Sequence, residues 1–372
     1  MGRPFVKLII FYISFLWASS FLRAIVPPHI LSRGIDFKEM TIGLIVLFSG
    51  QILLFFFLNK NFPSKLSWFL GMICFLLSVL LVIDVKSANQ YYLSSLFNGF
   101  LLFLFWVFYN IAHFKSTPKE KIGISSGVMF GIWPLVGVVA PLTAGFLGEI
   151  NLVIAWAVSL AFITLSAFLI KFQTNFSITF DIKESIKEIS STRLFIFISG
   201  VADALNLGLI PIYTLFFIKS ALGYGSFLAY LSLLSVFATL LIGRLSDKLQ
   251  KRIIFLYPVT IVMGAVSLLF TLGTENIIIW IVLSGIISFL VPIFWNISTA
   301  MVVDMSPNLE ISIPGREITL ALGRLLGLSF VLISFMYEQK PFYIFLVLGI
   351  IILLYPLLLF WSSKIRKKYH YL

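Results

Sequence analysis

Apolar stretches recur from one end of this 372-residue chain to the other, separated by short polar segments. Each stretch has roughly 20 residues, enough for a helix to cross about 30 Å of hydrocarbon. This pattern predicts an all-α membrane protein with twelve transmembrane helices. The predicted helices lie near 5–25, 41–58, 66–85, 91–113, 124–147, 152–171, 194–218, 226–244, 253–273, 277–302, 317–337 and 342–361.

The composition excludes several classes of protein. The chain is 60% hydrophobic and 11% charged, whereas a soluble domain carries about 25% charged residues. A soluble protein of this composition would lack the polar side chains needed to cover its surface. A soluble enzyme, a disordered chain and a nucleic-acid-binding domain are therefore excluded, and the lipid bilayer is the expected partner.

The basic residues predict the orientation in the membrane, because cytoplasmic loops carry an excess of Lys and Arg. The chain has 27 Lys and Arg residues against 15 Asp and Glu, a formal net charge of +12. With a cytoplasmic N-terminus, 20 of the 27, including Arg316, fall on the cytoplasmic side, and Arg23 and Arg324 fall inside helices. The outer side then carries Arg33, Lys38, Lys86, Lys219 and Lys340. We expect a multi-pass protein of the cell membrane with both termini in the cytoplasm.

The longest predicted connection divides the chain into two halves. Ile182, Ile186 and Ile189 recur in it at helical spacing, opposite lysines and glutamates. This pattern indicates a short amphipathic helix on the inner membrane surface, which serves as a plain tether or as a regulatory segment. We expect an N-terminal six-helix bundle in 1–172, a cytoplasmic linker in 173–193, and a C-terminal six-helix bundle with a cytoplasmic tail in 194–372.

The two halves also resemble each other in sequence. Residues 98–111 match residues 284–297 at a shift of 186 positions, and the match pairs Gly99 with Gly285 and Asn110 with Asn296. A six-helix unit repeated in the same orientation predicts two bundles related by an axis along the membrane normal.

The most specific motif lies between the predicted eighth and ninth helices, over residues 243–252. It resembles the inter-helix signature of the major facilitator superfamily, in which a Gly, an Asp four residues later and a basic pair close a tight cytoplasmic turn. The resemblance implies two pseudo-symmetric six-helix bundles that work by alternating access. It also implies a cytoplasmic gate built from Gly243, Arg244, Asp247, Lys251 and Arg252.

The chain departs from that signature in two places. Gln250 stands where the family usually has Gly, and the equivalent loop of the first half has Phe57 and Asn61 in place of the Gly and the acid. We therefore expect gating to be asymmetric.

The predicted fifth helix is similar to the antiporter motif of the same family. It contains Gly127, Pro141 and Gly145, but Val136 and Ala140 replace two expected glycines. Small residues allow close helix packing, and Pro141 favours a kink. Ordinary packing against the predicted eighth helix is an equally good interpretation of the motif.

Ionisable residues inside the predicted helices are few. A charge near the bilayer centre costs about 2.5–3.5 kcal/mol, so it usually faces protein or water. Asp203 lies near mid-membrane and is our candidate for a coupling group. Arg324 lies at similar depth and can pair with Asp203 or with Glu317, which would make it structural. Arg23 lies close enough to the outer surface to extend toward it.

In the family that the chain resembles, the first, fourth, seventh and tenth helices line the central cavity. Asn110 and Asn296 can instead form interhelical hydrogen bonds, and the aromatic residues can belong to an interfacial belt. The cavity residues implied by the resemblance are Trp17, Ser20, Arg23, Asn98, Trp106, Asn110, Asp203, Asn206, Tyr213, Trp295 and Asn296, with Arg324 added for its depth.

Together these features predict a transporter of a small-molecule substrate that acts as a monomer. We expect the proton as the coupling ion, no metal and no organic cofactor. The aromatic, weakly charged cavity favours export of an amphiphilic compound. The alternatives are an uncoupled or importing facilitator of a sugar or metabolite, and a lipid scramblase or sensor on the same fold. An enzyme is not expected, because the chain lacks HExxH, CxxC, Walker and nucleophile-elbow motifs.

Overall fold

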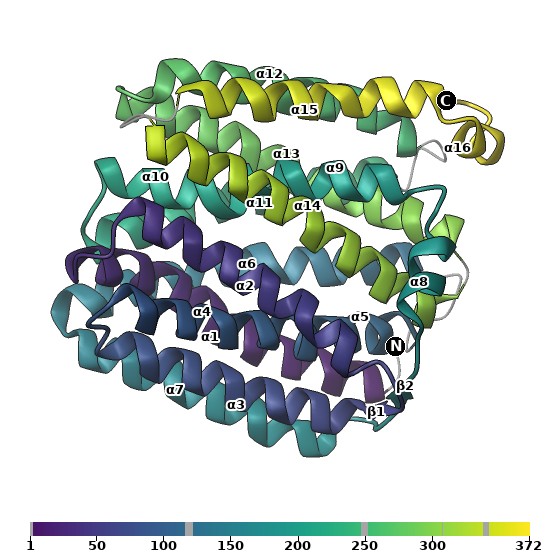
Figure 1. The fold of residues 1–372 in the computed structure, drawn as a ribbon. Coiled ribbons are helices and arrows are strands. Elements are labelled where there is room, and N and C mark those ends of the chain that lie inside the picture. Colours follow the sequence, from purple (N-terminus) through teal and green to yellow (C-terminus); the bar gives the residue numbers. More distant parts are fainter. Residues whose placement is uncertain (1–2, 116–121, 247–251, 307, 338–341) are drawn as a thin grey trace.

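The computed structural model describes residues 3–115, 122–246, 252–306, 308–337 and 342–372, with only the backbone at 3, 122–130, 242–246 and 252. Long helices run side by side, and both termini lie at the same end of the bundle (Figure 1). We call this end the terminus end and the opposite end the far end. Within the described residues, twelve helical spans are long and apolar enough to cross a membrane, which agrees with the number predicted.

The spans fall into an N-terminal half, α1 to α7, and a C-terminal half, α9 to α15. The first half contains α1 (Arg3–Ser32), α2 (Phe37–Phe57), α3 (Ser64–Ile83), α4 (Ala88–Leu102), the π-helix η1 (Phe103–Val107), α5 (Phe108–Lys115), α6 (Ile122–Ile150), α7 (Leu152–Leu169) and the 3-10 turn η3 (Ile170–Phe172). The second half contains α9 (Arg193–Ala204), the π-helix η4 (Leu205–Leu209), α10 (Ile210–Phe217), α11 (Ala221–Ser246), the 3-10 turn η5 (Arg252–Phe255), α12 (Leu256–Gly273), α13 (Ile277–Met305), α14 (Leu309–Tyr337) and α15 (Phe342–Trp361). β1 (Phe62–Pro63) lies between α2 and α3, β2 (Ser177–Ile178) and α8 (Ile182–Glu188) lie between the halves, and α16 (Ser363–Lys368) follows the second half.

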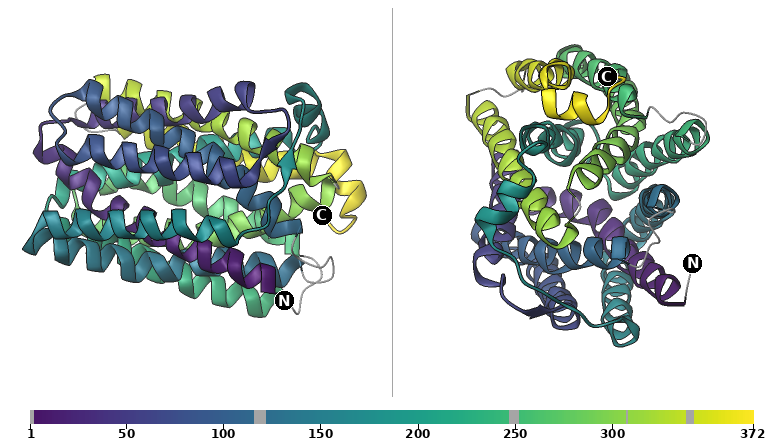
Figure 2. Two further views of the ribbon diagram at one scale, coloured as in Figure 1. Left: turned by 90° about the horizontal axis from the view of Figure 1, so that it is seen from below. Right: turned by 90° about the vertical axis from the view of Figure 1, so that its right-hand side faces the viewer.

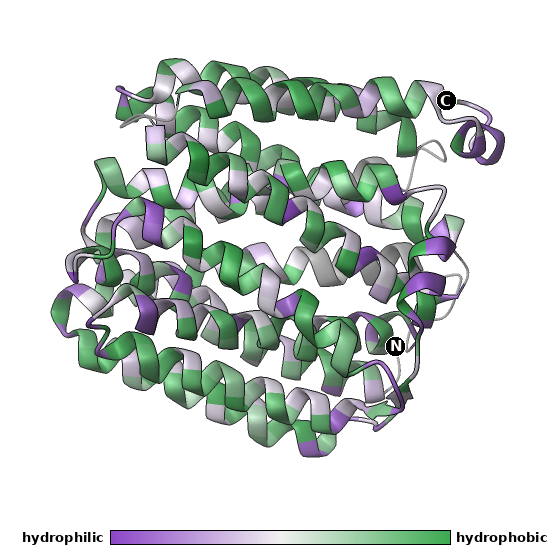
Figure 3. Ribbon diagram, viewed as in Figure 1, coloured by the Kyte–Doolittle hydropathy of each residue, from purple (hydrophilic) through white to green (hydrophobic). Residues whose placement is uncertain are grey.

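The arrangement of polar and apolar residues fits a membrane protein. Hydrophobic residues dominate the long helices, and hydrophilic residues gather at their two ends (Figure 3). Viewed along the helix axes, most C-terminal elements lie on one side of the bundle and most N-terminal elements on the other (Figure 2).

Among the helices that are longer than the sequence predicts, α1 and α14 extend furthest beyond their predicted ranges. α1 continues to Ser32 through Pro27 and Pro28, because proline removes only its own hydrogen bond and packing can hold the helix beyond it. His29 supplies such a contact through Nε2, 3.2 Å from the carbonyl oxygens of Val82 and Ile83 at the end of α3. α14 begins at Leu309 rather than at 317, which brings Arg316 inside a span.

The linker fastens the two halves together at the terminus end. Its β2 pairs antiparallel with β1 of the α2–α3 loop. In that loop Asn61 adopts a φ of 46°, which asparagine tolerates, and its N–H donates to Thr179 Oγ1 at 3.0 Å. The predicted linker helix is present as α8, and it packs against α14. A Cβ at Gly315 of α14 would collide with the Ser185 carbonyl of α8, so the linker contacts both halves.

Helix packing repeats between the halves as the sequence repeat predicts. α4 packs on α2 and α3, and α13 packs in the same way on α11 and α12. The repeat-related glycines occupy equivalent contacts, since a Cβ at Gly99 would collide with the Leu47 carbonyl of α2 and one at Gly285 with the Tyr230 hydroxyl of α11. α1 likewise packs on α6 and α7, and α9 on α14 and α15. The two halves therefore share one packing plan.

Small residues bring the two halves together along α6 and α11, which form the most extensive contact between the halves. A Cβ built on Gly145 would lie 2.7 Å from the Ala221 carbonyl oxygen and 3.1 Å from the Leu222 Cα. A Cβ at Gly225 would collide with the Pro141 carbonyl. Gly145 and Pro141 thus lie in this helix contact, while for Gly127 the structure describes only the backbone.

Substituting two glycines of α6 separates packing from helix propensity. We expect Gly145→Ala to lower the free energy of unfolding by about 1–3 kcal/mol, because backbone atoms of α11 must shift. Gly131→Ala is the matched control, since its Cβ would meet only the Thr239 Cγ2 at 3.6 Å. Thermal unfolding of the purified proteins measures the stability of both variants. Equal losses of stability at the two positions would contradict close packing of Gly145 against α11.

Candidate functional site

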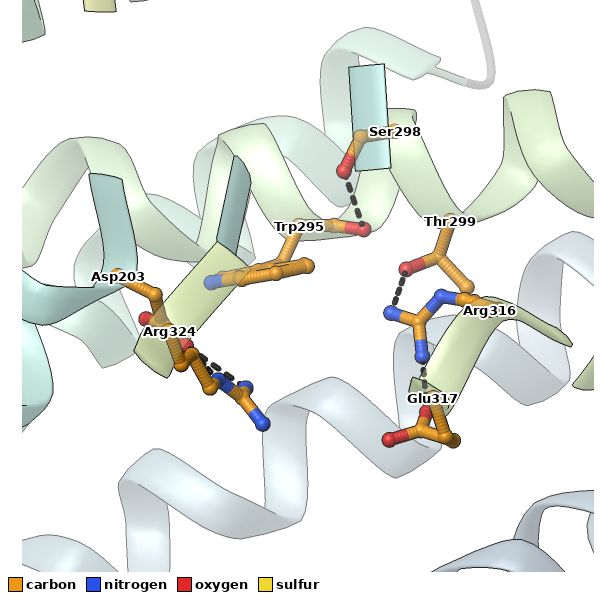
Figure 4. A network of polar contacts seen from close by, with 7 residues as sticks. All are labelled: Asp203, Trp295, Ser298, Thr299, Arg316, Glu317 and Arg324. Atoms are coloured by element: carbon orange, nitrogen blue, oxygen red, sulfur yellow. Dashed lines mark hydrogen bonds and ion pairs between the residues drawn. The ribbon is translucent and has the colours of Figure 1, made fainter. Parts of the chain in front are cut away.

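A buried ion pair lies near the middle of the helices. The Arg324 guanidinium of α14 reaches Oδ2 of Asp203 on α9, with Nε at 2.8 Å and Nη2 at 2.7 Å (Figure 4). The Asp203 side chain is 4% exposed and that of Arg324 is 15% exposed. Of the two partners that the sequence offered for Arg324, the structure therefore selects Asp203.

Glycines bring the two helices close enough for this pair to form. A Cβ at Gly323, next to Arg324, would collide with the Phe197 carbonyl and lie 2.9 Å from the Gly200 Cα. A Cβ at Gly327 would lie 2.6 Å from the Val201 carbonyl oxygen. Gly323 and Gly327 form a small-xxx-small pattern, the usual means of close helix approach in membranes. This crossing fixes the distance between the two charged side chains.

The pair lies where the two halves meet. The Arg324 guanidinium lies 5.0 Å from the ring centroid of Phe48 on α2, in the geometry of a cation–π contact. α2 packs against α14 along this region. Further contacts between the halves occur at both ends: Phe37 meets Phe335 at the far end, and Lys115 pairs with Glu310 at the terminus end. The Asp203–Arg324 pair therefore lies between contacts that join the two halves at both ends of the bundle.

A second polar network lies nearer the terminus end. Arg316 pairs with Glu317 at 2.5 Å, donates to Thr299 Oγ1 at 3.2 Å and faces the Trp295 ring at 5.7 Å (Figure 4). These residues border a small opening between α9, α13, α14 and α15. Its lining comprises Phe195, Ile196, Ser199, Trp295, Ser298, Thr299, Met301, Val302, Arg316 and Tyr355.

The position of Arg316 corrects the predicted start of this helix, which placed Arg316 in the loop before residue 317. Its side chain is only 15% exposed, and that of Glu317 only 7%. Small residues recur every four positions from Gly315 through Thr319 to Gly323. This spacing is the signal that could have extended the helix past 317, because it marks a continuous packing face.

Arg23 is an arginine within the α1 span. Arg23 is the only exposed residue between positions 11 and 31 of α1. Among the described residues it forms no ion pair and no hydrogen bond.

The aromatic candidates of the N-terminal half line up between helices. Trp17 stacks on Phe162 of α7, with ring centroids 5.2 Å apart. Trp106 stacks on Trp133 of α6 at 5.6 Å. Trp106 lies in the π-helix η1, a type of helix that is frequent at functional sites.

The polar candidates differ in their surroundings. Asn206 lies in the π-helix η4, three residues after Asp203, and is half-buried, as are Asn98 and Asn296. Ser20 is buried on α1. The Oδ1 atom of Asn110 is buried and accepts no hydrogen bond from the described residues. The interhelical hydrogen bond considered for Asn110 and Asn296 is therefore not found in the described part of the chain.

Tyr213 lies in α10, near the end of the span that begins with α9. It is fully buried, its hydroxyl donates to the Thr274 carbonyl at 2.8 Å, and its ring contacts Trp280 at 4.9 Å. The structure places this residue in the aromatic core of the C-terminal half.

Most of the predicted gate loop lies outside the residues that the structure describes. Asp247 and Lys251 lie outside the described residues, and for Gly243, Arg244 and Arg252 only the backbone is described. No group of three metal-ligating His, Cys, Asp or Glu side chains occurs among the described residues.

Comparison with known proteins defines the class of fold. No protein-family model and no curated protein sequence matches the chain. Solved structures do match over nearly their whole length, each at 12% sequence identity. A POT family transporter in complex with a thioalcohol-conjugated peptide gives a TM-score of 0.74, covering 98% of this chain and 96% of that one.

Two further structures support the same class. A POT family transporter in complex with 5-aminolevulinic acid gives a TM-score of 0.73, covering 98% of this chain and 97% of that one. The human organic anion transporter MFSD10 gives 0.70, with 96% and 99% covered. The chain therefore has the major facilitator fold, as its sequence predicted.

A double-mutant cycle tests the buried pair. We expect Asp203→Asn or Arg324→Gln alone to destabilise the protein by about 3–5 kcal/mol, because each leaves one buried charge unpaired. The double variant should recover much of this loss. Unfolding of the purified variants in detergent measures the cycle.

The exposed ion pair between Lys86 and Asp84, at 2.9 Å, provides the control. Lys86→Gln should leave unfolding unchanged, because a solvated pair contributes little. Strictly additive effects at Asp203 and Arg324 would contradict the buried pair.

Proposed function

We propose that the chain is a secondary transporter that moves a small solute across the cell membrane by alternating access. The observation that carries this proposal is the Asp203–Arg324 ion pair, enclosed near mid-depth where the two halves meet. Intramembrane charges usually mark substrate or ion pathways. In folds built from repeats, the transport site lies at the interface of the repeats.

The solved structures of similar fold support a small solute. Two of those proteins are in complex with a conjugated peptide or 5-aminolevulinic acid, and the third is an organic anion transporter. For this chain we propose a monomer with both termini in the cytoplasm and no enzymatic activity. The aromatic side chains of Trp17, Trp106 and Trp295 among the candidate cavity residues support an amphiphilic solute, and we propose export as the direction.

Asp203 is the proposed coupling group. A proton that binds Asp203 neutralises the carboxylate and removes the charge that holds Arg324. The guanidinium can then turn toward Phe48 and the interface, where it is available to the solute. Loss of the proton restores the pair. The pair thus provides an element with two arrangements that both proton and solute can bias.

The contacts between the halves are the proposed gates. The Lys115–Glu310 pair would have to separate when the terminus end opens, and the Phe37–Phe335 contact when the far end opens. The linker, which contacts the α2–α3 loop and α14, would keep the halves in register during this motion.

Flux into proteoliposomes tests this function. We expect a pH gradient to drive accumulation of at least one compound from a panel of small amphiphiles, peptides and metabolites. Asp203→Asn should abolish the dependence on the gradient, because the residue no longer binds or releases a proton. Glu149→Gln, at an exposed position of α6, is the control and should transport normally.

Two other results would indicate a different function. Flux that is unaffected by Asp203→Asn would mean an uncoupled facilitator. Movement of labelled lipids without flux of any soluble compound would mean a scramblase, and would contradict the proposal.

A further inference from the structure

A basic segment directly follows the last transmembrane helix. α16, a strongly hydrophilic helix at the terminus end (Figure 3), carries Lys364, Arg366, Lys367 and Lys368, and all four are exposed. No Asp or Glu occurs in the sequence after Glu338. In the described part of the chain, none of the first three basic side chains forms an ion pair. α16 therefore presents positive charge that the described residues do not neutralise.

The other face of α16 is fastened to the bundle. Ile365 is fully buried, and the hydroxyl of Tyr369, one turn later, donates to Asp304 Oδ2 at 3.1 Å. The Lys368 ammonium donates to the backbone carbonyl of Asp304, near the end of α13. These contacts give the exposed basic side chains a defined place on the surface.

The surface that adjoins α16 is an apolar face of α15. Exposed apolar residues recur on this helix every three to four positions, which is typical of a face in contact with hydrocarbon. The Arg366 guanidinium lies 5.2 Å from the ring centroid of Phe360, an exposed residue in the last turn of α15. The positive charge therefore begins where the apolar stripe ends. This stripe comprises Val347, Ile350, Leu354, Leu357 and Trp361.

The last span of the N-terminal half ends with a related contact. The Lys171 ammonium lies 3.5 Å from the ring centroid of Phe168, which is also exposed. Phe168 corresponds to Phe360 at a shift of 192 positions. Basic side chains near the ends of transmembrane helices extend along apolar surface and place their charge at the membrane–water interface. Both contacts thus indicate the level of this interface at the terminus end, where α16 lies.

We propose that α16 and the adjoining end of α15 bind an anionic phospholipid. Lys364, Arg366 and Lys367 would contact the phosphate of the headgroup, and an acyl chain would lie along the apolar stripe of α15. Basic clusters next to a transmembrane helix attract anionic headgroups, and each Lys or Arg adds to the affinity. A guanidinium also offers paired N–H donors to phosphate oxygens.

The combination of charge and stripe favours a lipid over a soluble anion. A soluble anion would use the basic side chains and leave the apolar stripe without a partner. A phospholipid without net charge would use the stripe and gain little from the basic side chains. The site requires only that the chain spans a membrane, so it does not depend on the proposed transport function.

Quenching of tryptophan fluorescence by brominated lipids tests the site. Purified protein is reconstituted in phosphatidylcholine vesicles that contain a rising fraction of either brominated phosphatidylglycerol or brominated phosphatidylcholine. Trp361 is the reporter, because it is 74% exposed at the end of the stripe. The difference between the natural chain and Trp361→Phe isolates its signal from the other tryptophans. We expect phosphatidylglycerol to bind about 10-fold more tightly there, with a smaller preference at high salt.

Variants assign the preference to α16. Arg366→Gln combined with Lys367→Gln should lower the preference to about twofold, because half of the basic side chains of α16 are removed. Arg366→Lys, which keeps the charge, should retain most of it. Lys183→Gln combined with Lys187→Gln is the matched control. It also removes two exposed charges, but from α8, where glutamates offset them, and it should leave the preference unchanged.

Several results would overturn the assignment. Equal quenching by the two lipids in the natural chain would leave the basic surface to a soluble anionic partner. A preference that survives the double variant of α16 would place the lipid elsewhere, and an equal loss in the α8 control would indicate general surface charge. If the α16 variant does not fold, salt decides, because a preference that high salt leaves unchanged would contradict a site based on charge.

Discussion

The pairing of Asp203 with Arg324 is the interaction on which the described structure most depends. In hydrocarbon each charge alone is unfavourable, and breaking a buried pair leaves an uncompensated charge. The pair requires α9 and α14 to approach almost backbone to backbone, and Gly200, Gly323 and Gly327 permit that approach. Packing and electrostatics are therefore two aspects of one helix crossing.

α14 connects the α9–α14 crossing to several other parts of the molecule. The same helix packs on α2 of the other half, on α8 of the linker and on α9. It also carries Glu310, Arg316, Glu317 and Arg324, each in an ion pair. In the proposed cycle, a change in the central pair would reach the opposite half and the linker through this one helix.

Much of this fold can be predicted from the sequence. Twelve spans follow from apolar runs, the shared packing plan follows from Gly99 and Gly285, and α8 follows from three isoleucines at helical spacing. These signals are local, or repeat at a fixed shift. Asp203 was also found by sequence, because an acid deep in an apolar run is rare.

Other features depend on contacts between distant segments. Whether Arg23 faces lipid, water or the C-terminal half depends on helix rotation, which apolar composition does not specify. Arg316 was assigned to a loop because the apolar run was predicted to begin at 317, whereas α14 begins at Leu309 and packs on α8 and α9. The pairing of β1 with β2 joins residues more than 100 positions apart, and two-residue strands have no recognisable pattern of their own.

The central claim is that the Asp203–Arg324 pair sets the balance between states open at opposite ends. Spin-label distance measurements test it most directly, in a Cys74→Ala background with one label pair at positions 86 and 219 and another at 60 and 364. We expect Asp203→Asn to change the two distance distributions in opposite senses, one end closing as the other opens, while Glu149→Gln leaves both unchanged. Identical distributions in Asp203→Asn and the natural chain would contradict the claim.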